Sequence, residues 1–165
     1  MKLKIYILLL LLPTSIYSTE LYLRPEIGIS PISTADDIQY SGFQTAVNFG
    51  LNFHFLFSEL GVKHSSTSSS QDVDFSTTSF HATVGLRPDD QFSFALNLYP
   101  IINSESKPSM KEYSGNGVGL SMGWIPYHQF YLNGEYRFYG LENDINEQEK
   151  LSFSEFIFSV SYLFY

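Results

Sequence analysis

The sequence predicts an all-β protein, an eight-stranded antiparallel up-and-down transmembrane β-barrel. Eight runs of residues alternate between apolar side chains and small or polar ones, and short and long connections alternate between these runs. Charged residues make up only 16% of the 165 residues, whereas about 25% is typical of soluble domains. These features indicate strands with one apolar and one polar face, and too few charges to cover a soluble surface.

The N-terminal segment is predicted to be a cleaved signal peptide, residues 1–18, which leaves residues 19–165 as the barrel domain. Its apolar run, Ile5–Leu12, is too short to span a bilayer as a helix, which needs about 20 residues. Such a peptide directs export through the Sec pathway. Its removal takes away Lys2 and Lys4, so the formal net charge changes from −8 to −10.

The first half of the barrel domain contains four alternating runs. In the second run, Phe43, Val47 and Phe49 share one face, and Gln44 and Asn48 share the other. Alternation with a period of two is the signal of a strand with different environments on its two faces. The four predicted strands are Leu21–Ser30, Gly42–Phe55, Ser58–Ser66 and Thr77–Arg87.

The second half repeats the pattern. In the last run Phe156, Phe158 and Val160 oppose Ile157 and Ser159. Helical periodicity does not compete with the alternation in these runs. The four predicted strands are Phe92–Tyr99, Asn116–Ile125, Phe130–Tyr139 and Ser152–Tyr165.

The connections differ in length in an ordered way. Short links such as "RPDDQ" and "PYHQ" alternate with longer ones such as "PISTADDIQYS" and "PIINSESKPSMKEYSG". Up-and-down membrane barrels combine short turns at one end with longer outer loops at the other, so both termini should lie at the short-turn end. The longer connections are Ser-rich or acidic, with Asp36, Asp37, Asp72, Asp74, Glu142, Asp144, Glu147 and Glu149.

The apolar face is predicted to contact lipid, because it carries no Asp, Glu, Lys or Arg in any of the eight runs. The predicted lipid-facing residues are Phe43, Val47, Phe49, Leu51, Phe53, Phe94, Leu96, Leu120, Met122, Phe156, Phe158, Val160 and Tyr162. Aromatic residues near the strand ends are candidates for interfacial girdles, namely Tyr22, Phe43, Phe53, Phe92, Trp124, Tyr127, Phe130 and Phe138.

The opposite face is small or polar and should line a narrow lumen. Eight strands leave interior room for side chains and little more, and an unpaired buried charge is strongly destabilising. We therefore expect a luminal ion-pair and hydrogen-bond network that fills the lumen and leaves no wide channel. Its predicted members are Arg24, Glu26, Glu59, Lys63, His81, Arg87, Glu135 and Arg137.

Three segments resemble the small eight-stranded outer-membrane proteins of the OmpA/OmpX and opacity-protein type: "FGLNFHF", "SELGVKHSSTSSS" and "VSYLFY". The resemblance implies a bacterial cell outer membrane location among outer-membrane lipids and lipopolysaccharide. It also implies assembly by periplasmic chaperones and the barrel-assembly machinery, read from a C-terminal signal at Tyr162, Phe164 and Tyr165. The implied role is a monomeric structural anchor that presents four surface loops, for adhesion or envelope integrity, to an unidentified extracellular ligand.

Two alternatives stay open. His64, Ser66 and Asp74 are weak candidates for a Ser/His/acid site, since "HSS" is faintly similar to the His-x-Ser motif of outer-membrane lipid A deacylases. A soluble lipocalin-like ligand binder would instead place the apolar face inside. No cofactor or metal site is expected, as there are no cysteines and the four histidines form no ligand spacing. The negative net charge argues against nucleic acid as a partner.

Overall fold

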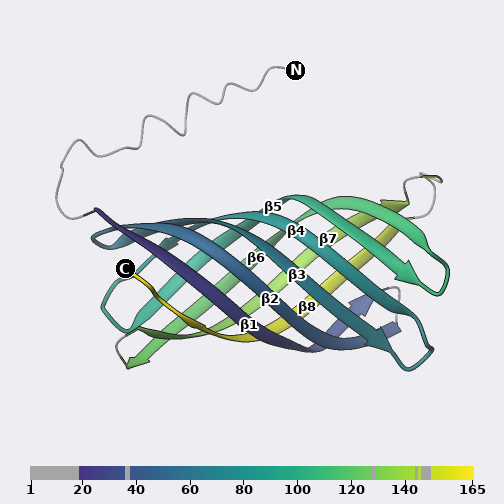
Figure 1. Ribbon diagram of the computed structural model, residues 1–165, viewed down its shortest axis with the longest axis horizontal. Coiled ribbons are helices and arrows are strands. Elements are labelled where there is room, and N and C mark those ends of the chain that lie inside the picture. The colour runs from purple at the N-terminus through teal and green to yellow at the C-terminus, as the bar shows by residue number, and fades with distance from the viewer. Residues whose placement is uncertain (1–18, 36–37, 128, 144, 146–149) are drawn as a thin grey trace, which may run out of the picture.

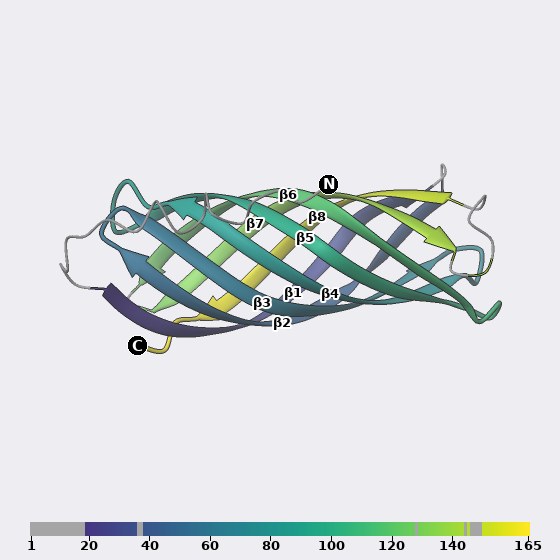
Figure 2. The ribbon, with the colours of Figure 1, turned by 90° about the horizontal axis from the view of Figure 1, so that it is seen from above.

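The described part of the chain is a closed β-barrel. The computed structural model describes residues 19–35, 38–127, 129–143, 145 and 150–165, and the predicted signal peptide lies outside them. Within these residues the strands are β1 Thr19–Ala35, β2 Ile38–Phe53, β3 Leu56–Ser69, β4 Asp74–Leu86, β5 Phe92–Lys107, β6 Lys111–Tyr127, β7 Phe130–Asn143 and β8 Lys150–Tyr162. Each strand pairs antiparallel with the next, and β1 pairs with β8. The predicted fold class is confirmed, and Figures 1 and 2 show the strands tilted along an elongated barrel.

The two ends of the barrel differ. Figure 1 shows the start of β1 and the C-terminus at the same end, where Thr19 pairs with Phe53 beside the β2–β3 turn. We call this the turn end, because the β4–β5 and β6–β7 connections also lie there. The opposite end, which carries the other four connections, is called the loop end. Among the described residues there is no helix long and apolar enough to cross a membrane.

The strands are longer than the sequence predicts. β1 and β6 each contain 17 residues, whereas about 9–11 residues suffice for a transmembrane strand. Most of the extra length lies at the loop end, where β1 continues to Ala35 and β2 begins at Ile38. The prediction of long connections is therefore partly wrong, because much of those segments belongs to the strands.

Proline-containing bulges explain why the alternation ends early in β1 and β5. The β1–β2 register shifts between Ser30 and Ser33, around Pro31, and the β5–β6 register shifts between Tyr99 and Ile102, around Pro100. One extra residue in a strand reverses the faces of all later residues. A period-two pattern ends at such a point although the strand continues.

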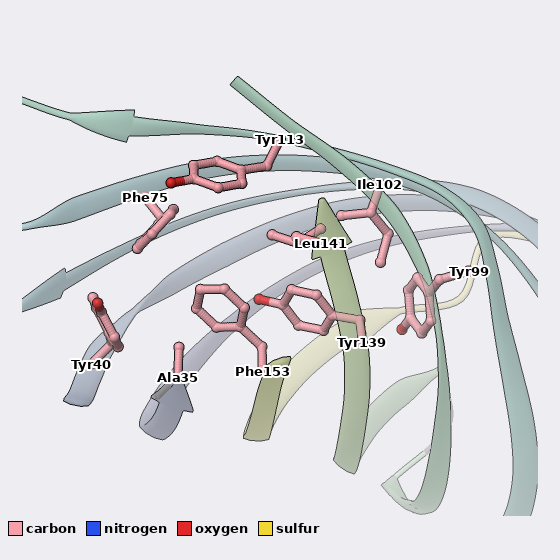
Figure 3. Close-up of a cluster of buried hydrophobic side chains, with 9 residues drawn as sticks. All are labelled: Ala35, Tyr40, Phe75, Tyr99, Ile102, Tyr113, Tyr139, Leu141 and Phe153. Atoms are coloured by element: carbon pink, nitrogen blue, oxygen red, sulfur yellow. The ribbon is translucent and has the colours of Figure 1, made fainter. Parts of the chain in front are cut away.

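The same bulges mark a change in what the barrel encloses. Towards the turn end the outward faces are apolar and the lumen is polar; beyond the bulges the outward faces carry residues such as Ser68, Asn103 and Ser152, and a cluster of apolar side chains shares the interior with small polar ones such as Thr77 and Ser104. Figure 3 shows buried side chains converging inside the loop end, with the Tyr139 and Phe153 rings stacked 5.0 Å apart. This group, called the aromatic cap, consists of Ala35, Tyr40, Phe75, Tyr99, Ile102, Tyr113, Tyr139, Leu141 and Phe153.

Candidate functional site

The polar lumen contains three groups of ion pairs along the barrel. In the group nearest the turn end, Arg24 Nη2 lies 2.6 Å from Glu59 Oε2, and its Nη1 lies 2.7 Å from Glu26 Oε2. The Tyr22 hydroxyl donates to Glu59 at 2.8 Å. Tyr22 is buried, so the prediction that it belongs to an interfacial girdle is wrong. It is spaced by two residues from Arg24, and residues with this spacing point to the same face of a strand, which here is the inward face.

The middle group is centred on Glu135. Its Oε2 lies 2.5 Å from Lys63 Nζ, and its Oε1 accepts hydrogen bonds from Asn97 Nδ2 at 2.9 Å and from the Tyr99 hydroxyl. Lys63 also donates to the Tyr99 hydroxyl at 2.9 Å. These residues come from β3, β5 and β7, so one carboxylate links three strands across the lumen.

The third group lies next to the aromatic cap. Arg137 pairs with Glu155, which also accepts hydrogen bonds from Tyr139 at 3.0 Å and from Ser33 at 3.2 Å. The sequence prediction missed Glu155. This residue lies two positions before the inward-facing Ile157, so the alternation along the strand already placed it on the inward face.

The remaining predicted luminal residues occupy different levels. His81 is buried with its ring 5.6 Å from the Tyr99 ring, and the Arg87 guanidinium lies 5.7 Å from the centre of the Phe57 ring at the turn end. Counting Arg87, the described luminal charges balance, with the cations of Arg24, Lys63, Arg87 and Arg137 against the carboxylates of Glu26, Glu59, Glu135 and Glu155.

Small residues on the wall make room for the luminal rings. A Cβ atom at Gly50 would lie 2.3 Å from the Tyr22 ring, and one at Gly123 would lie 2.0 Å from the Tyr131 hydroxyl. The described lumen is thus filled by side chains, with charges that balance in number and the aromatic cap towards the loop end. Among the described residues there is no group of three His, Asp or Glu side chains that could hold a metal ion.

The predicted lipid-facing residues all point away from the lumen. Leu51, Phe53 and Tyr162 are half-buried by their neighbours, and the others are exposed. At the turn end the outward aromatic residues form a girdle, called the turn-end girdle, of Phe53, Phe55, Phe92, Trp124, Tyr127 and Phe130.

The C-terminal residues of the predicted assembly signal lie at the seam between β8 and β1. Phe164 exchanges two backbone hydrogen bonds with Leu23, at 2.8 and 2.9 Å, and its side chain is exposed on the same face as Tyr162. The Tyr165 ring lies 6.2 Å from the Tyr22 ring.

The candidate Ser/His/acid residues are not arranged as a triad. His64 Nδ1 lies 3.1 Å from the Thr78 hydroxyl, which is its cross-strand neighbour. Ser66 lies opposite Ser76, and Asp74 lies opposite Ser68. The strand register therefore gives His64 a threonine partner where a triad would need a serine and a carboxylate.

The rim of the loop end is predominantly acidic. Among the described residues, the loop end carries five acidic side chains and three lysines, namely Asp72, Asp74, Glu105, Glu112, Glu142, Lys107, Lys111 and Lys150. Lys150 Nζ lies 2.6 Å from Glu142 Oε1, and both side chains are more than half exposed. This set of charged residues is called the acidic rim. The other predicted loop acids, Asp36, Asp37, Asp144, Glu147 and Glu149, lie outside the described residues.

The fold is similar to that of known outer-membrane barrels. Neisserial surface protein A (NspA) matches with a TM-score of 0.59 and 11% identity over 90% of this chain and all of that chain. Ail, the attachment invasion locus protein of Yersinia pestis, matches with a TM-score of 0.56 and 13% identity over 88% of this chain and 97% of that one. A second Ail structure, in complex with the heparin analogue sucrose octasulfate, matches with a TM-score of 0.57 and 12% identity over 90% of this chain and all of that chain.

Sequence comparison adds no relative: no family model and no curated protein matches the chain. At these identities the structural likeness speaks for the fold alone, a small closed transmembrane barrel. The lipocalin-like alternative is wrong, because the apolar faces point outward and the described charges of the strand centres point into the lumen.

Proposed function

We propose that this protein is an anchor in the bacterial outer membrane that holds an acidic rim above the lipid surface for contact with other surfaces. The reversal of polarity along the barrel carries this proposal. An apolar exterior fits hydrocarbon only where the strands cross the bilayer. A polar exterior over an interior that holds the aromatic cap, as at the loop end, fits water.

The charge of the rim favours a basic partner. Acidic side chains outnumber the lysines of the acidic rim, so the field above it attracts cations and repels anions. Ail has been crystallised with a sulfated ligand, the heparin analogue sucrose octasulfate. The same ligand chemistry would be repelled here, so adhesion to a basic protein surface fits this chain better than adhesion to sulfated sugars.

The test combines location and binding. Mature protein should fractionate with the outer membrane and migrate differently on gels before and after boiling, as a stable barrel does. Purified barrel should bind immobilised polylysine and not heparin, and Glu105→Gln with Glu112→Gln should weaken the polylysine binding. Recovery of the mature protein in the soluble periplasm would overturn the membrane role, and preferential binding to heparin would overturn the basic partner.

The lumen supports an anchor and not a pore. The ion pairs and the aromatic cap fill the interior in succession, so we propose that the barrel is closed to solutes. During export we expect periplasmic chaperones and the barrel-assembly machinery to act on the chain, with Tyr162, Phe164 and Tyr165 as the recognised signal, and the product to be a monomer.

The lipid A deacylase alternative makes a separate prediction. Since Ser66 and Asp74 are not the neighbours of His64, we propose that these residues have no catalytic role. Lipopolysaccharide incubated with wild-type protein should keep its acyl chains, and Ser66→Ala should change nothing. Release of fatty acid that depends on Ser66 would show that the chain is an enzyme.

A further inference from the structure

The outer wall of β2–β5 carries a row of polar side chains next to a row of apolar ones. Strand register places Val47, Val62, Phe80 and Ile101 side by side in one outward row, and each is at least 41% exposed. One outward step towards the loop end lies a second row with a different character. It consists of Thr45, His64, Thr78 and Asn103, all exposed, and is called the neutral row.

The neutral row offers hydrogen-bonding groups without Lys, Arg, Asp or Glu. It presents two hydroxyls, an amide and an imidazole, and His64 and Thr78 are held together at 3.1 Å. The row directly above it consists of Phe43, Ser66, Ser76 and Glu105. Phe43 is exposed, so the apolar surface of β2 extends one step higher than that of β3–β5, and the charged Glu105 lies beside Ser76. Phosphate groups are bound chiefly by Arg and Lys, so this composition fits neutral polar groups such as sugar hydroxyls better than phosphate.

The height of the neutral row on the barrel determines which part of a surrounding lipid can contact it. A lipid whose acyl chains cover Val47, Val62, Phe80 and Ile101 must place its headgroup one residue step higher, against the neutral row. We infer that the neutral row binds the sugar headgroup of glycolipids in the outer leaflet. This inference rests on the proposed insertion in the outer membrane and adds to it a face of the barrel, β2–β5, that selects one class of lipid headgroup.

The experiment compares two lipids that differ in the headgroup. Refolded protein is placed in phosphatidylcholine vesicles that contain either monoglucosyl diacylglycerol or phosphatidylglycerol with the same acyl chains, and its thermal unfolding midpoint is measured. The glycolipid should raise the midpoint and phosphatidylglycerol should not. In the variant T78V/N103L the rise should be largely lost, because the sugar hydroxyls lose their partners.

The matched control is N116L/S152V, which makes the same kinds of change at exposed loop-end positions of β6 and β8 and should keep the full rise. An equal rise with phosphatidylglycerol, or an undiminished rise in T78V/N103L, would overturn the inference. Flotation of the protein with the vesicles is scored separately. A failure to float contradicts the proposed membrane role, whereas flotation without a glycolipid-specific rise contradicts only the neutral row.

A second measurement does not depend on how well the double variant folds. A photo-crosslinking benzoylphenylalanine at position 78 should capture the glycolipid headgroup in preference to phosphatidylglycerol. The same group at position 62, one outward step lower, should capture the acyl chains of both lipids equally. Equal capture of the two lipids at position 78 would also overturn the inference.

Discussion

At the scale of single residues, Glu135 joins an ammonium, an amide and a phenol of two other strands. It is fully buried and pairs with Lys63 while it accepts hydrogen bonds from Asn97 and Tyr99. Glu135→Gln leaves the Lys63 ammonium buried without its counter-charge, and breaking a buried pair in this way costs about 3–5 kcal/mol. We expect a loss of this size in the free energy of unfolding, measured by urea titration of the refolded barrel in vesicles.

The matched control is the exposed pair Glu142–Lys150. Surface pairs contribute roughly 0–1 kcal/mol, so Glu142→Gln should leave the unfolding curve nearly unchanged. Similar effects of the two substitutions would show that the luminal pair is not the structural element described above.

Phe49 tests the lipid contact at the same scale. It lies on the outward face of β2, 55% exposed, two outward steps below Thr45. Phe49→Arg should cost about 2–4 kcal/mol in vesicles, because a cation near the middle of the bilayer is poorly solvated, whereas Thr45→Arg near the interface should cost about 0–1 kcal/mol. Urea titration of both variants checks the difference, and equal costs would mean that β2 does not cross hydrocarbon.

At the scale of strands, the Pro100 bulge sets which face of β5 points inward. Before the bulge Asn97 and Tyr99 are buried, and after it Ile102 and Ser104 are buried. Insertion of one alanine between Ile101 and Ile102 would shift the phase of all later residues, so it should expose Ile102 and place Asn103 inside. We expect the insertion variant to lose the heat-modifiable gel shift, while Pro100→Ala, which keeps the residue count, retains it. A normal gel shift in the insertion variant would show that the phase of β5 beyond the bulge is dispensable.

The strand centres could be predicted from the sequence, because alternation between Phe43 and Phe53 or between Phe92 and Tyr99 is uninterrupted. The strand ends could not, since Pro31 and Pro100 change the phase of the alternation inside β1 and β5. Ala35 and Ile102 of the aromatic cap were hidden for the same reason. Tyr40 and Phe75, whose rings lie 5.5 Å apart, keep the alternation of β2 and β4, but they lie in Ser- and Asp-containing segments that were assigned to loops.

The luminal network was partly predictable. Parity alone places Lys63 and Glu135 on inward faces, and Coulomb attraction in a narrow lumen requires partners for both. The choice of partner depends on shear and register across strands that are distant in sequence. The alternation therefore predicted that Arg137 points inward, but it did not predict its partner Glu155. Nor could it show that Glu135 accepts a hydrogen bond from Tyr99.

At the scale of the whole molecule, the filled lumen predicts that the barrel does not conduct ions. The ion pairs occupy successive levels of the interior, and the aromatic cap adds apolar side chains towards the loop end. Planar bilayer recordings of refolded protein should show no discrete conductance steps. The double variant Phe153→Ala with Tyr139→Ala removes two stacked rings of the cap and should still not conduct, since the ion pairs remain. Steady single-channel steps in the wild-type protein would contradict the closed lumen.

The assignment of the apolar face to lipid is tested most directly by identifying what surrounds the barrel at each level. The chain has no cysteines, so a single spin label can be attached at Phe49→Cys, Leu98→Cys or, at the loop end, Ser68→Cys. Electron paramagnetic resonance in vesicles should show labels 49 and 98 accessible to oxygen and shielded from a water-soluble nickel chelate, and label 68 accessible to the chelate. Equal accessibility of all three labels to the nickel chelate would contradict the assignment of the apolar face to lipid.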